Sequence, residues 1–285
     1  MKILYIINPV SGKKKGKEIG ALAEVKSRLT GTILEFRYTE YPGHAIRLAK
    51  DTDADIVVAV GGDGTVNEVA SGIVGTNKAL GIIPTGSGNG LALHLGISRD
   101  VKKALKQLAR EEYREIDCGS INGHPFFCSC GVGLDAEVSA AFASSEKRGL
   151  GTYIREALRI WKNYTPKHYH LLLDETEVEL DAVLITVGNA NQWGNNAYIC
   201  PQANIGDGLL DVTILKPFRT IAAPGLIIRL MTGRLDRSKF VECIHAKNIK
   251  IIRDNAGWAH HDGECIEMGK EIDISVASQK LKVVC

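Results

Sequence analysis

The sequence predicts an α/β fold in two parts, a parallel sheet with crossover helices followed by a mostly antiparallel region. Two observations support this division. Through residue 118, short apolar runs alternate with longer amphipathic stretches, which is the pattern of a parallel sheet covered by helices. From about Ile116 onward, apolar runs follow one another without helical stretches of similar length, which indicates antiparallel strands. We therefore predict two domains, at residues 1–118 and 119–285.

In the first domain, four apolar runs predict strands, and each is followed by a loop rich in Gly, Pro, Ser or Thr. These strands are Ile3–Ile7, Ile33–Tyr38, Ile56–Val60 and Ala79–Ile83. Amphipathic periodicity predicts helices at Lys17–Leu29, His44–Lys50, Val66–Ile73 and Val101–Arg110. A local basic run fits either a solvated helix start or a site that attracts anions; it consists of Lys13, Lys14, Lys15 and Lys17. Because ligands of open α/β sheets bind at the carboxyl ends of the strands, we expect the polar loops to share one functional edge.

Six further apolar runs predict the strands of the second domain: Pro125–Cys130, His168–Leu173, Ala182–Val187, Leu209–Leu215, Asn248–Ile252 and Glu271–Val276. Helical patterns occur at Thr152–Trp161 and at Thr220–Thr232. Within the latter, Ile221–Met231 is apolar apart from one arginine and is too short to span a bilayer. It fits either a core or lid helix or a lipid-facing lip that enters one leaflet.

The composition narrows the classes of function. A formal net charge of only +2 gives no support to a general nucleic-acid-binding role. The seven cysteines are scattered without a Cys-x-x-Cys pair, so neither a zinc site nor a disulfide framework is indicated. Reduced thiols in a cytoplasm fit this usage best. The first ten residues are too short for a membrane span and lack a small-residue cleavage site, so we interpret them as the first strand.

Three loops of the first domain combine glycine with hydroxyl or carboxylate side chains. They are Asn8-Pro9-Val10-Ser11-Gly12, Gly61-Gly62-Asp63-Gly64-Thr65 with Asn67-Glu68 in the following helix, and Pro84-Thr85-Gly86-Ser87-Gly88-Asn89. Glycines let backbone N–H groups approach phosphate oxygens, and a helix N-terminus adds partial positive charge. The hydroxyls of Ser11, Thr65 and Ser87 can donate to the same oxygens. Three such loops on one edge predict a phosphate-binding site.

The acid in the second loop predicts a metal ion. Ionised Asp63 cannot donate a hydrogen bond to a phosphate oxygen, so its natural role is to hold Mg²⁺ or a metal-bound water beside the phosphates. No Walker-type Gly-Lys-Ser/Thr follows these loops, and no Gly-x-Gly-x-x-Gly opens the first helix. Both absences argue against a P-loop enzyme and a dinucleotide dehydrogenase.

The ordered set of motifs resembles the diacylglycerol kinase catalytic family, which includes bacterial lipid kinases and the sphingosine and ceramide kinases. The resemblance covers nearly the whole chain. Its first-domain motifs are Asn8–Gly12, Thr39 with Gly43-His44-Ala45, Gly61–Glu68 and Pro84–Asn89. Its second-domain motifs are Gly131-Val132-Gly133-Leu134-Asp135-Ala136, Gly188-Asn189-Ala190, Pro201-Gln202-Ala203, Asp207-Gly208-Leu209-Leu210-Asp211-Val212 and Asp262-Gly263-Glu264. The Gly-Gly-Asp-Gly stretch by itself also occurs in NAD kinases and phosphofructokinases, whereas the ordered set is specific.

The resemblance implies a Rossmann-like ATP-binding domain followed by a β-sandwich that helps to form the acceptor site. The implied nucleotide-binding residues are Asn8, Pro9, Val10, Ser11, Gly12, Thr39, Gly61, Gly62, Asp63, Gly64, Thr65, Asn67, Glu68, Ser87 and Asn89. Asp207 would hold a structural Mg²⁺ with the main-chain carbonyls of Asn204 and Leu209.

Asp262 and Glu264 would supply the base that takes the proton of the acceptor hydroxyl, with Asp63 as a further catalytic residue. As residues two apart on a strand, Asp262 and Glu264 would share a face. The resemblance favours Glu264 as the proton acceptor and Asp262 as its orienting partner, and the reverse assignment stays open.

Together these features predict an ATP-dependent lipid kinase that uses Mg²⁺ and acts on a lipid such as diacylglycerol or a sphingoid base at the membrane surface. An NAD kinase-like enzyme and a non-catalytic nucleotide-binding regulator are the alternatives. The acceptor stays open because Gly90 stands where diacylglycerol kinases usually carry an aspartate. We expect a cytoplasmic protein with peripheral membrane contact and no nucleic-acid partner, and a homodimer is one candidate assembly.

Overall fold

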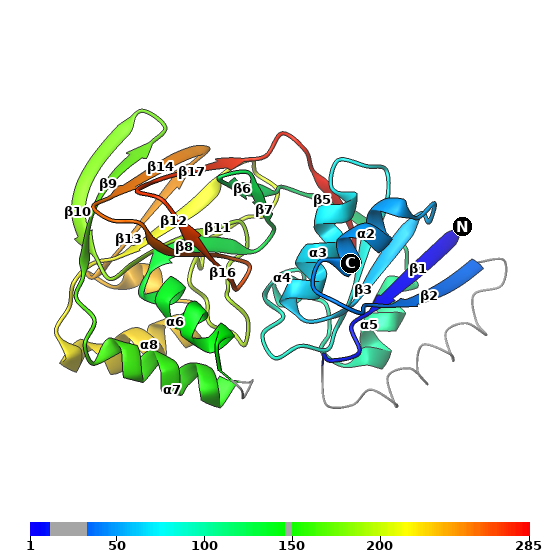
Figure 1. Ribbon diagram of the computed structural model, residues 1–285, viewed down its shortest axis with the longest axis horizontal. Helices are drawn as coiled ribbons and strands as arrows, with labels where there is room; N and C mark the ends of the chain where they lie inside the picture. Colours follow the sequence, from blue (N-terminus) through cyan, green and yellow to red (C-terminus); the bar gives the residue numbers. More distant parts are fainter. Residues whose placement is uncertain (12–32, 146–149) are drawn as a thin grey trace. The chain divides into compact units, whose positions relative to one another are not determined.

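The computed structural model of the chain describes residues 1–11, 33–145 and 150–285. They form two compact units, one made of Met1–Ile116 with Gln279–Cys285 and the other of Asp117–Ser278. The α/β architecture predicted from the sequence is confirmed, with a mainly parallel sheet in the first unit and antiparallel sheets in the second. Figure 1 shows the helices that accompany these sheets.

The first unit is built on a six-stranded sheet in the order β2-β1-β3-β4-β18-β5. Its strands are β1 (Lys2–Ile7), β2 (Ile33–Tyr38), β3 (Ile56–Gly61), β4 (Ala79–Pro84), β5 (Tyr113–Ile116) and β18 (Leu281–Val284). Neighbouring strands from β2 to β18 are parallel, and β5 runs antiparallel to β18 at one edge. Every residue of β3 and β4 is buried, as expected for central strands of a parallel sheet. The four strands predicted for this unit are confirmed.

The helices of the first unit are α2 (His44–Asp51), α3 (Asp63–Ile73), α4 (Gly90–His94) and α5 (Val101–Leu108). Three of them confirm predicted helices, with α3 beginning already at Asp63. The predicted helix Lys17–Leu29 and the basic run before it lie outside the described residues. The sequence does not predict α4, because a helix of five residues is too short to show amphipathic periodicity.

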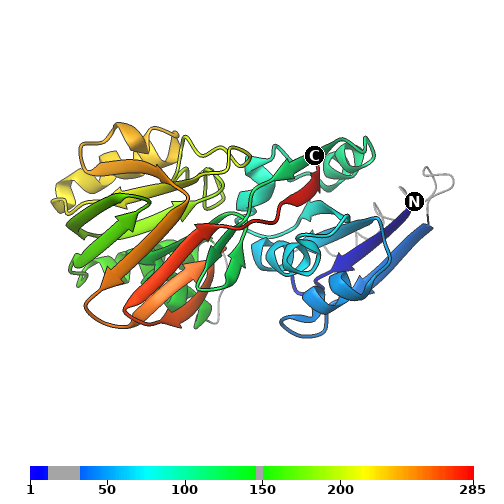
Figure 2. The same cartoon turned by 90° about the horizontal axis from the view of Figure 1, so that it is seen from above.

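The C-terminal strand belongs to the first unit, which corrects the expected second domain of residues 119–285. Strand β18 pairs in parallel with β4, through Lys282↔Ala79 and Val283↔Leu80, and antiparallel with β5. Leu281 is 1% exposed, so the strand is part of the core. Figure 2 shows this red strand among the blue and cyan elements of the first unit. The sequence of a short apolar strand does not specify its partner, so the return of the chain could not be predicted.

The second unit contains two six-stranded sheets, β10-β9-β14-β17-β6-β7 and β13-β12-β11-β8-β15-β16. The strands of the first of these sheets are β6 (Gly119–Ile121), β7 (His124–Phe126), β9 (Lys167–Leu173), β10 (Thr176–Ala182), β14 (Asn248–Arg253) and β17 (Glu271–Val276). Those of the other are β8 (Ser129–Gly133), β11 (Leu184–Gly188), β12 (Leu210–Leu215), β13 (Val241–Ala246), β15 (Gly257–His261) and β16 (Glu264–Met268). Side chains from both sheets, such as Leu171 and Val187, share one buried core. The unit is therefore a β-sandwich.

The predicted strand Pro125–Cys130 is wrong, because two strands of different sheets replace it. Strand β7 ends at Phe126 and β8 begins at Ser129. Between them, the N–H groups of Phe127 and Cys128 donate to the carboxylate of Asp262 at 2.9 and 2.8 Å. This contact lets the chain leave one sheet and enter the other. A local sequence pattern cannot predict it, because Asp262 lies far from Phe127 and Cys128 in the sequence.

The helices of the second unit are α6 (Leu134–Ala143), α7 (Leu150–Trp161) and α8 (Ala223–Met231), with short 3-10 turns η1 (Thr220–Ala222) and η2 (Leu235–Arg237). The sequence predicts α7 and α8 but not α6. On α8, Leu226 is 7% exposed, whereas Ile227 and Ile228 are 57% and 63% exposed. One face of this helix is therefore core and the other is open to solvent. The core interpretation holds for the buried face, and the lipid-facing interpretation of the outer face stays a prediction.

Within the three described ranges, no helix has the length and apolar character needed to cross a membrane.

We expect Leu281→Ala to destabilise the first unit by about 2–4 kcal/mol, because it removes a buried side chain and leaves a cavity. Urea unfolding followed by circular dichroism measures the loss, and native-state hydrogen exchange should show faster exchange in β4 and β5 than in the second unit. The exposed control Ser278→Ala should change stability by less than about 0.5 kcal/mol. Unchanged protection of β4 and β5 in the Leu281 variant would contradict the placement of β18.

Candidate functional site

The loops that follow β3 and β4 meet at the carboxyl edge of the first sheet. A Cβ atom on Gly86 would lie 2.5 Å from the Cα of Gly62, and one on Gly62 would lie 3.2 Å from the Cα of Gly86. The N–H of Thr85 also donates to the carbonyl of Gly61 at 2.8 Å. The two backbones are so close that glycine is required at the contact, and the contact lies at the carboxyl edge of the sheet, where ligands of open α/β sheets bind.

Asp63 joins the same two loops through its carboxylate. It is the first residue of α3, and its Oδ2 and Oδ1 accept the N–H groups of Asn89 and Gly90 at 2.8 and 2.7 Å. These donors lie at the start of α4, so the negative charge also caps that helix. An ionised carboxylate at this edge is also the kind of ligand that a hard cation such as Mg²⁺ prefers. The residue therefore fits the Mg²⁺ role expected from the sequence and has a structural role as well.

Side chains of the first loop connect it to the other two loops. Asn8 Nδ2 donates to Thr65 Oγ1 at 3.1 Å, and Asn8 Oδ1 accepts the N–H of Val10 at 3.0 Å. Thr85 Oγ1 donates to Ser11 Oγ at 3.1 Å. The structure thus joins side chains of all three loops in one cluster, which the sequence could only place on a common edge. The predicted binding residue Gly12 lies outside the described residues.

The third loop is closed by Asn89, whose φ of 59° lies in the left-handed region. Its Oδ1 accepts the N–H of Gly86 at 3.1 Å, and its Nδ2 donates to the carbonyl of Gly86 at 2.8 Å. Arg99 Nη2 donates to the carbonyl of Ser87 at 2.7 Å and so brings a positive charge to the loop. Arg99 is a residue that the sequence analysis does not single out, because it lies far outside the motif.

Glu68 binds the start of α2 with both of its carboxylate oxygens. It accepts the N–H groups of Gly43 and Ala45 at 2.9 and 3.0 Å. Thr39 lies nearby in the chain, and its N–H donates to the carbonyl of Ile7 at 2.9 Å. The two motifs Gly61–Glu68 and Gly43-His44-Ala45 are therefore one structural unit, in which Glu68 orients a helix.

Asp262 and Gly263 form the two-residue turn of the hairpin β15–β16. Their φ angles are 47° and 84°, as a type I′ turn requires, and Asp-Gly is a favoured sequence for it. The prediction that Asp262 and Glu264 share one strand face is therefore wrong. An Asp-Gly pair between two apolar runs is itself a hairpin signal, and it would have revealed the turn.

The two acids of this hairpin have different environments. Asp262 is 9% exposed, and its carboxylate accepts three backbone N–H groups, those of Phe127, Cys128 and Ser129, at 2.9, 2.8 and 3.0 Å. Glu264 is exposed at the first position of β16, opposite His261 in the ladder. The structure thus separates a carboxylate that fixes the backbone from one that solvent reaches.

Strand β15 is anchored by a buried acid–imidazole pair to which the sequence analysis assigns no role. Asp135 Oδ2 lies 3.0 Å from His260 Nε2 and accepts the hydroxyl of Thr186 at 2.8 Å. Both members of the pair are 3% exposed. A Cβ atom on Gly131 would lie 2.8 Å from Asp135 Oδ2, which explains the glycine opposite His260. The motif Gly131–Ala136 therefore fixes β15 against β8.

The segment expected to hold a structural Mg²⁺ forms a tight turn. The N–H of Asp207 donates to the carbonyl of Asn204 at 3.5 Å, and the N–H of Leu209 donates to Asp207 Oδ1 at 3.0 Å. Burial raises the pKa of nearby Asp211 to about 6; His245 opposes the rise and the charge of Asp207 adds to it. A raised carboxyl pKa next to a second acid marks negative charge that a cation would offset.

Across the described parts of the chain, no group of three or more His, Cys, Asp or Glu side chains could hold a metal ion. A metal at Asp207 would therefore need carbonyl oxygens and water as its other ligands, which suits a hard cation.

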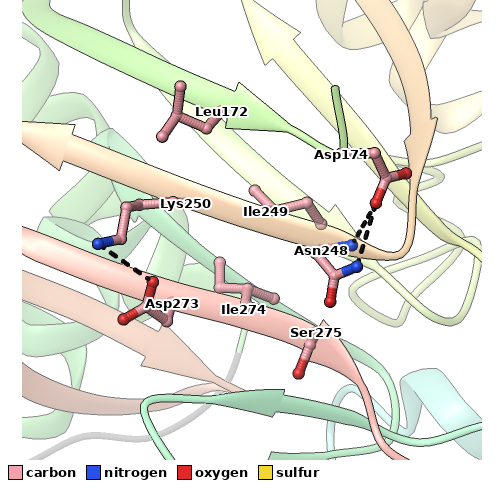
Figure 3. Close-up of a pocket in the computed structure, with 8 residues that line it drawn as sticks. All are labelled: Leu172, Asp174, Asn248, Ile249, Lys250, Asp273, Ile274 and Ser275. Atoms are coloured by element: carbon pink, nitrogen blue, oxygen red, sulfur yellow. Dashed lines mark hydrogen bonds and ion pairs between the residues drawn. The ribbon is translucent and has the colours of Figure 1, made fainter. Parts of the chain in front are cut away.

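A hollow of about 300 Å³ lies over β9, β14 and β17 of the second unit, and Figure 3 shows the side chains that line it. Its polar side chains pair with one another: Asn248 Nδ2 donates to Asp174 Oδ1 at 3.3 Å, and Lys250 Nζ lies 3.7 Å from Asp273 Oδ1. None of the residues predicted from the sequence to be functional lines this hollow. We assign it no part in the candidate site.

Comparisons with known proteins agree with both units. The protein-family model described as "Diacylglycerol kinase catalytic domain" matches residues 2–121. A second family model, described as "YegS C-terminal NAD kinase beta sandwich-like domain", matches residues 128–285. A Pseudomonas aeruginosa protein named "Probable lipid kinase YegS-like" is 32% identical over 290 residues, which cover 99% of this chain and 93% of the relative. The diacylglycerol kinase of Bacillus subtilis is 31% identical over 271 residues, covering 92% and 89%.

Solved structures show the same fold. A crystal structure from Bacillus anthracis, described as a candidate diacylglycerol kinase, has a TM-score of 0.83 at 25% identity and covers 99% of this chain and 94% of that chain. An NAD kinase from Archaeoglobus fulgidus has a TM-score of 0.58 at 16% identity, with coverage of 100% and 94%. The latter likeness extends to the fold alone.

We expect Gly86→Ala to weaken ATP binding by roughly tenfold or more, because a methyl group at that contact forces two backbones apart at a cost of about 1–3 kcal/mol. Gly62→Ala, with its longer contact, is the matched comparison and should weaken binding less. Isothermal titration with ATP measures both. Equal affinities for the two variants and the wild type would show that the contact between the loops does not shape the site.

We expect His261→Gln to flatten the pH dependence of stability on the acid side of pH 6.5. Burial lowers the pKa of His261 in the folded protein. Its contribution to stability is therefore fully present above the unfolded pKa and is lost as the pH falls below that value. Urea midpoints of the second unit across this range measure the slope, with exposed His168→Gln as the control. An unchanged acid slope in the His261 variant would contradict the prediction.

Proposed function

The chain belongs to the family of diacylglycerol kinases and YegS-like lipid kinases, and on that premise we propose that it transfers the γ-phosphoryl group of ATP to a lipid hydroxyl. The observation that carries the proposal is the junction of the loops after β3 and β4. There the backbones of Gly62 and Gly86 approach closely, and Asp63 binds the start of α4. This arrangement supplies N–H donors and a fixed carboxylate at one edge, as a phosphoryl-transfer site needs.

We assign the phosphates of ATP to the N–H groups of these glycine loops and to the N-terminus of α3. That helix has eleven residues and begins directly after Gly62, so its partial positive charge points toward the loops. The hydroxyls of Ser11, Thr65 and Ser87 complete the donor set. Hydrogen bonds among Asn8, Thr65, Ser11 and Thr85 hold these side chains before a ligand arrives, which lowers the entropy cost of binding.

We propose that Asp63 holds the Mg²⁺ that accompanies ATP and that Asp207 holds a second, structural Mg²⁺. Asp63 fits because the two backbone bonds fix its carboxylate at the edge where the loops after β3 and β4 meet, and carboxylate oxygens are preferred ligands of Mg²⁺. Asp207 fits because its carboxylate lies in a tight turn with Asn204 and Leu209, whose main-chain carbonyls are the other ligands we assign. When bound with ATP, the metal ion neutralises charge on the phosphate oxygens.

For the base, the structure favours Glu264 over Asp262. Three backbone N–H groups occupy the carboxylate of Asp262, so this acid is suited to positioning the hairpin. Glu264 is exposed at the start of β16 and is held by the same hairpin. We therefore assign Glu264 to accept the proton of the acceptor hydroxyl and Asp262 to position it.

The proposed acceptor is a lipid such as diacylglycerol or a sphingoid base. We propose that the protein is cytoplasmic and reaches this lipid by peripheral contact with a membrane surface. Gly90 supports a departure from the usual diacylglycerol site, because it begins α4 and its N–H is bound by Asp63. An NAD kinase-like activity is supported only by a shared fold. A homodimer is part of the proposal as the simplest assembly.

We expect Glu264→Gln to lower lipid phosphorylation at least 100-fold, which is within the range for loss of a general base, while ATP affinity and melting temperature stay unchanged. Asp262→Asn should also lower turnover, but with a lower melting temperature, because an amide cannot accept all three backbone N–H groups as a carboxylate does. Labelled ATP with diacylglycerol, sphingosine or NAD as acceptor measures turnover.

Normal turnover of Glu264→Gln would remove Glu264 from the mechanism. Transfer to NAD without transfer to any lipid would replace the proposed function by the NAD kinase alternative. ATP binding without transfer to any acceptor would favour the non-catalytic regulator.

A further inference from the structure

The outer face of α8 exposes an unusual run of large apolar side chains. Ile221 in η1 is 90% exposed, and Ile227, Ile228 and Met231 on α8 are 57%, 63% and 45% exposed. At about 100° per residue, the three helical side chains fall within an arc of roughly 100°. Leu226 is on the other side, where it is buried. A continuous apolar strip of this kind marks a surface that contacts a partner.

The segment that carries this strip is rich in basic residues. Between residues 216 and 239 the chain has one acid, Asp236, whereas its basic residues are Lys216, Arg219, Arg229, Arg234, Arg237 and Lys239. The acid is engaged, since Asp236 Oδ2 accepts from Gln202 Nε2 at 2.8 Å. Arg219 and Arg234 are exposed on either side of α8 in the chain. Lys216 is paired with Glu242, with Nζ 2.7 Å from Oε2, but the other basic residues still make this segment positive, although the net charge of the whole chain is only +2.

The strip rests on a firm base within the second unit. Leu226 and the partly buried Leu230 pack with Trp193, Phe218 and Phe240 in a small core. The ring of Phe218 also stacks on Trp161 at the end of α7, with centroids 4.9 Å apart. The packed inner face fixes α8 in place, so the apolar side chains of its outer face stay exposed to solvent.

We propose that the outer face of α8, with Ile221, Ile227, Ile228 and Met231 and with exposed basic residues on either side of it in the chain, docks this chain on an anionic lipid bilayer. The apolar strip enters the interface between headgroups and acyl chains, and the arginines bind lipid phosphates. Charge complementarity favours a bilayer as the binding partner. An apolar patch flanked by basic residues is complementary to a membrane whose anionic headgroups cover hydrocarbon. The inference rests on the proposed function in that a kinase of this kind must reach a lipid hydroxyl.

The test is flotation of the full-length chain with vesicles, without ATP. One set is phosphatidylglycerol mixed with phosphatidylcholine, and the other is phosphatidylcholine alone. We expect binding to the anionic set only, weakened at least about tenfold in Ile227→Ser/Ile228→Ser, since each buried methylene adds to partitioning. Arg219→Gln/Arg234→Gln should weaken it roughly fivefold for each charge removed.

Matched controls come from the first unit. Ile33→Ser removes an apolar side chain that is 66% exposed on β2, and Lys102→Gln/Lys106→Gln removes two exposed charges from α5. Both should float as the wild type does. Leu226→Ser reports on the buried face and should lower the melting temperature, whereas the outer-face variants should melt normally.

Three outcomes overturn the proposal: no flotation of the wild type with anionic vesicles, unchanged flotation of the Ile227 and Ile228 variant, or equal losses in the controls. A fourth outcome also overturns it: the Ile227→Ser/Ile228→Ser variant has a lower molecular mass than the wild type by light scattering, while its flotation is unchanged. The outer face would then be a contact between two copies of the chain.

Measurements of activity separate this inference from the proposed function. If the wild type phosphorylates a detergent-dispersed lipid but the variants float as the wild type does, only the docking surface is overturned. If flotation follows the predicted pattern but no lipid is phosphorylated, only the kinase assignment is overturned.

Discussion

Two hydrogen bonds to the carboxylate of Asp63 hold together the part of the first unit on which the candidate site depends. Parallel pairing of β3 with β4 ends their loops at the same edge, but pairing alone does not bring two loops into contact. The bonds from the N–H groups of Asn89 and Gly90 do so, and they require the backbones of Gly62 and Gly86 to touch. Asn8 then joins β1 to the junction through Thr65. The position of every proposed phosphate donor follows from this one charged side chain.

Several acids of the chain act in the same way, by binding backbone N–H groups of a distant segment. Glu68 accepts two such bonds from the start of α2, and Asp262 accepts three from the segment between β7 and β8. A hydrogen bond to a charged acceptor is roughly twice as strong as one between neutral groups, so these contacts suit loops that lack ladder partners. Carboxylates of the functional motifs thus serve first to shape the backbone, and only some of them are also placed for chemistry.

Sequence analysis predicts the features that depend on local pattern. Strands β1, β3 and β4 appear as apolar runs because they are buried in a parallel sheet. The loops after β3 and β4 appear as glycine clusters because their close backbone contact requires glycine. Features that depend on distant partners stay hidden. The return of β18 to β4, the bonds of Glu68 to α2 and the break after Phe126 are all decided by residues far away in the chain. The hairpin at Asp262 is the exception, since Asp-Gly itself signals the turn.

The position of Glu264 follows from a chain of rigid contacts that begins in the buried core. Asp135 at the start of α6 holds His260 on β15, with both side chains almost fully buried. One residue beyond His261, the type I′ turn reverses the chain, and the carboxylate of Asp262 ties that turn to the N–H groups after β7. Glu264 is the first residue past the turn, so its backbone is fixed from both sides while its side chain faces solvent. If Glu264 is the base, as we propose, these contacts fix the position of its backbone before a substrate binds, and positioning of this kind is a major source of catalytic rate.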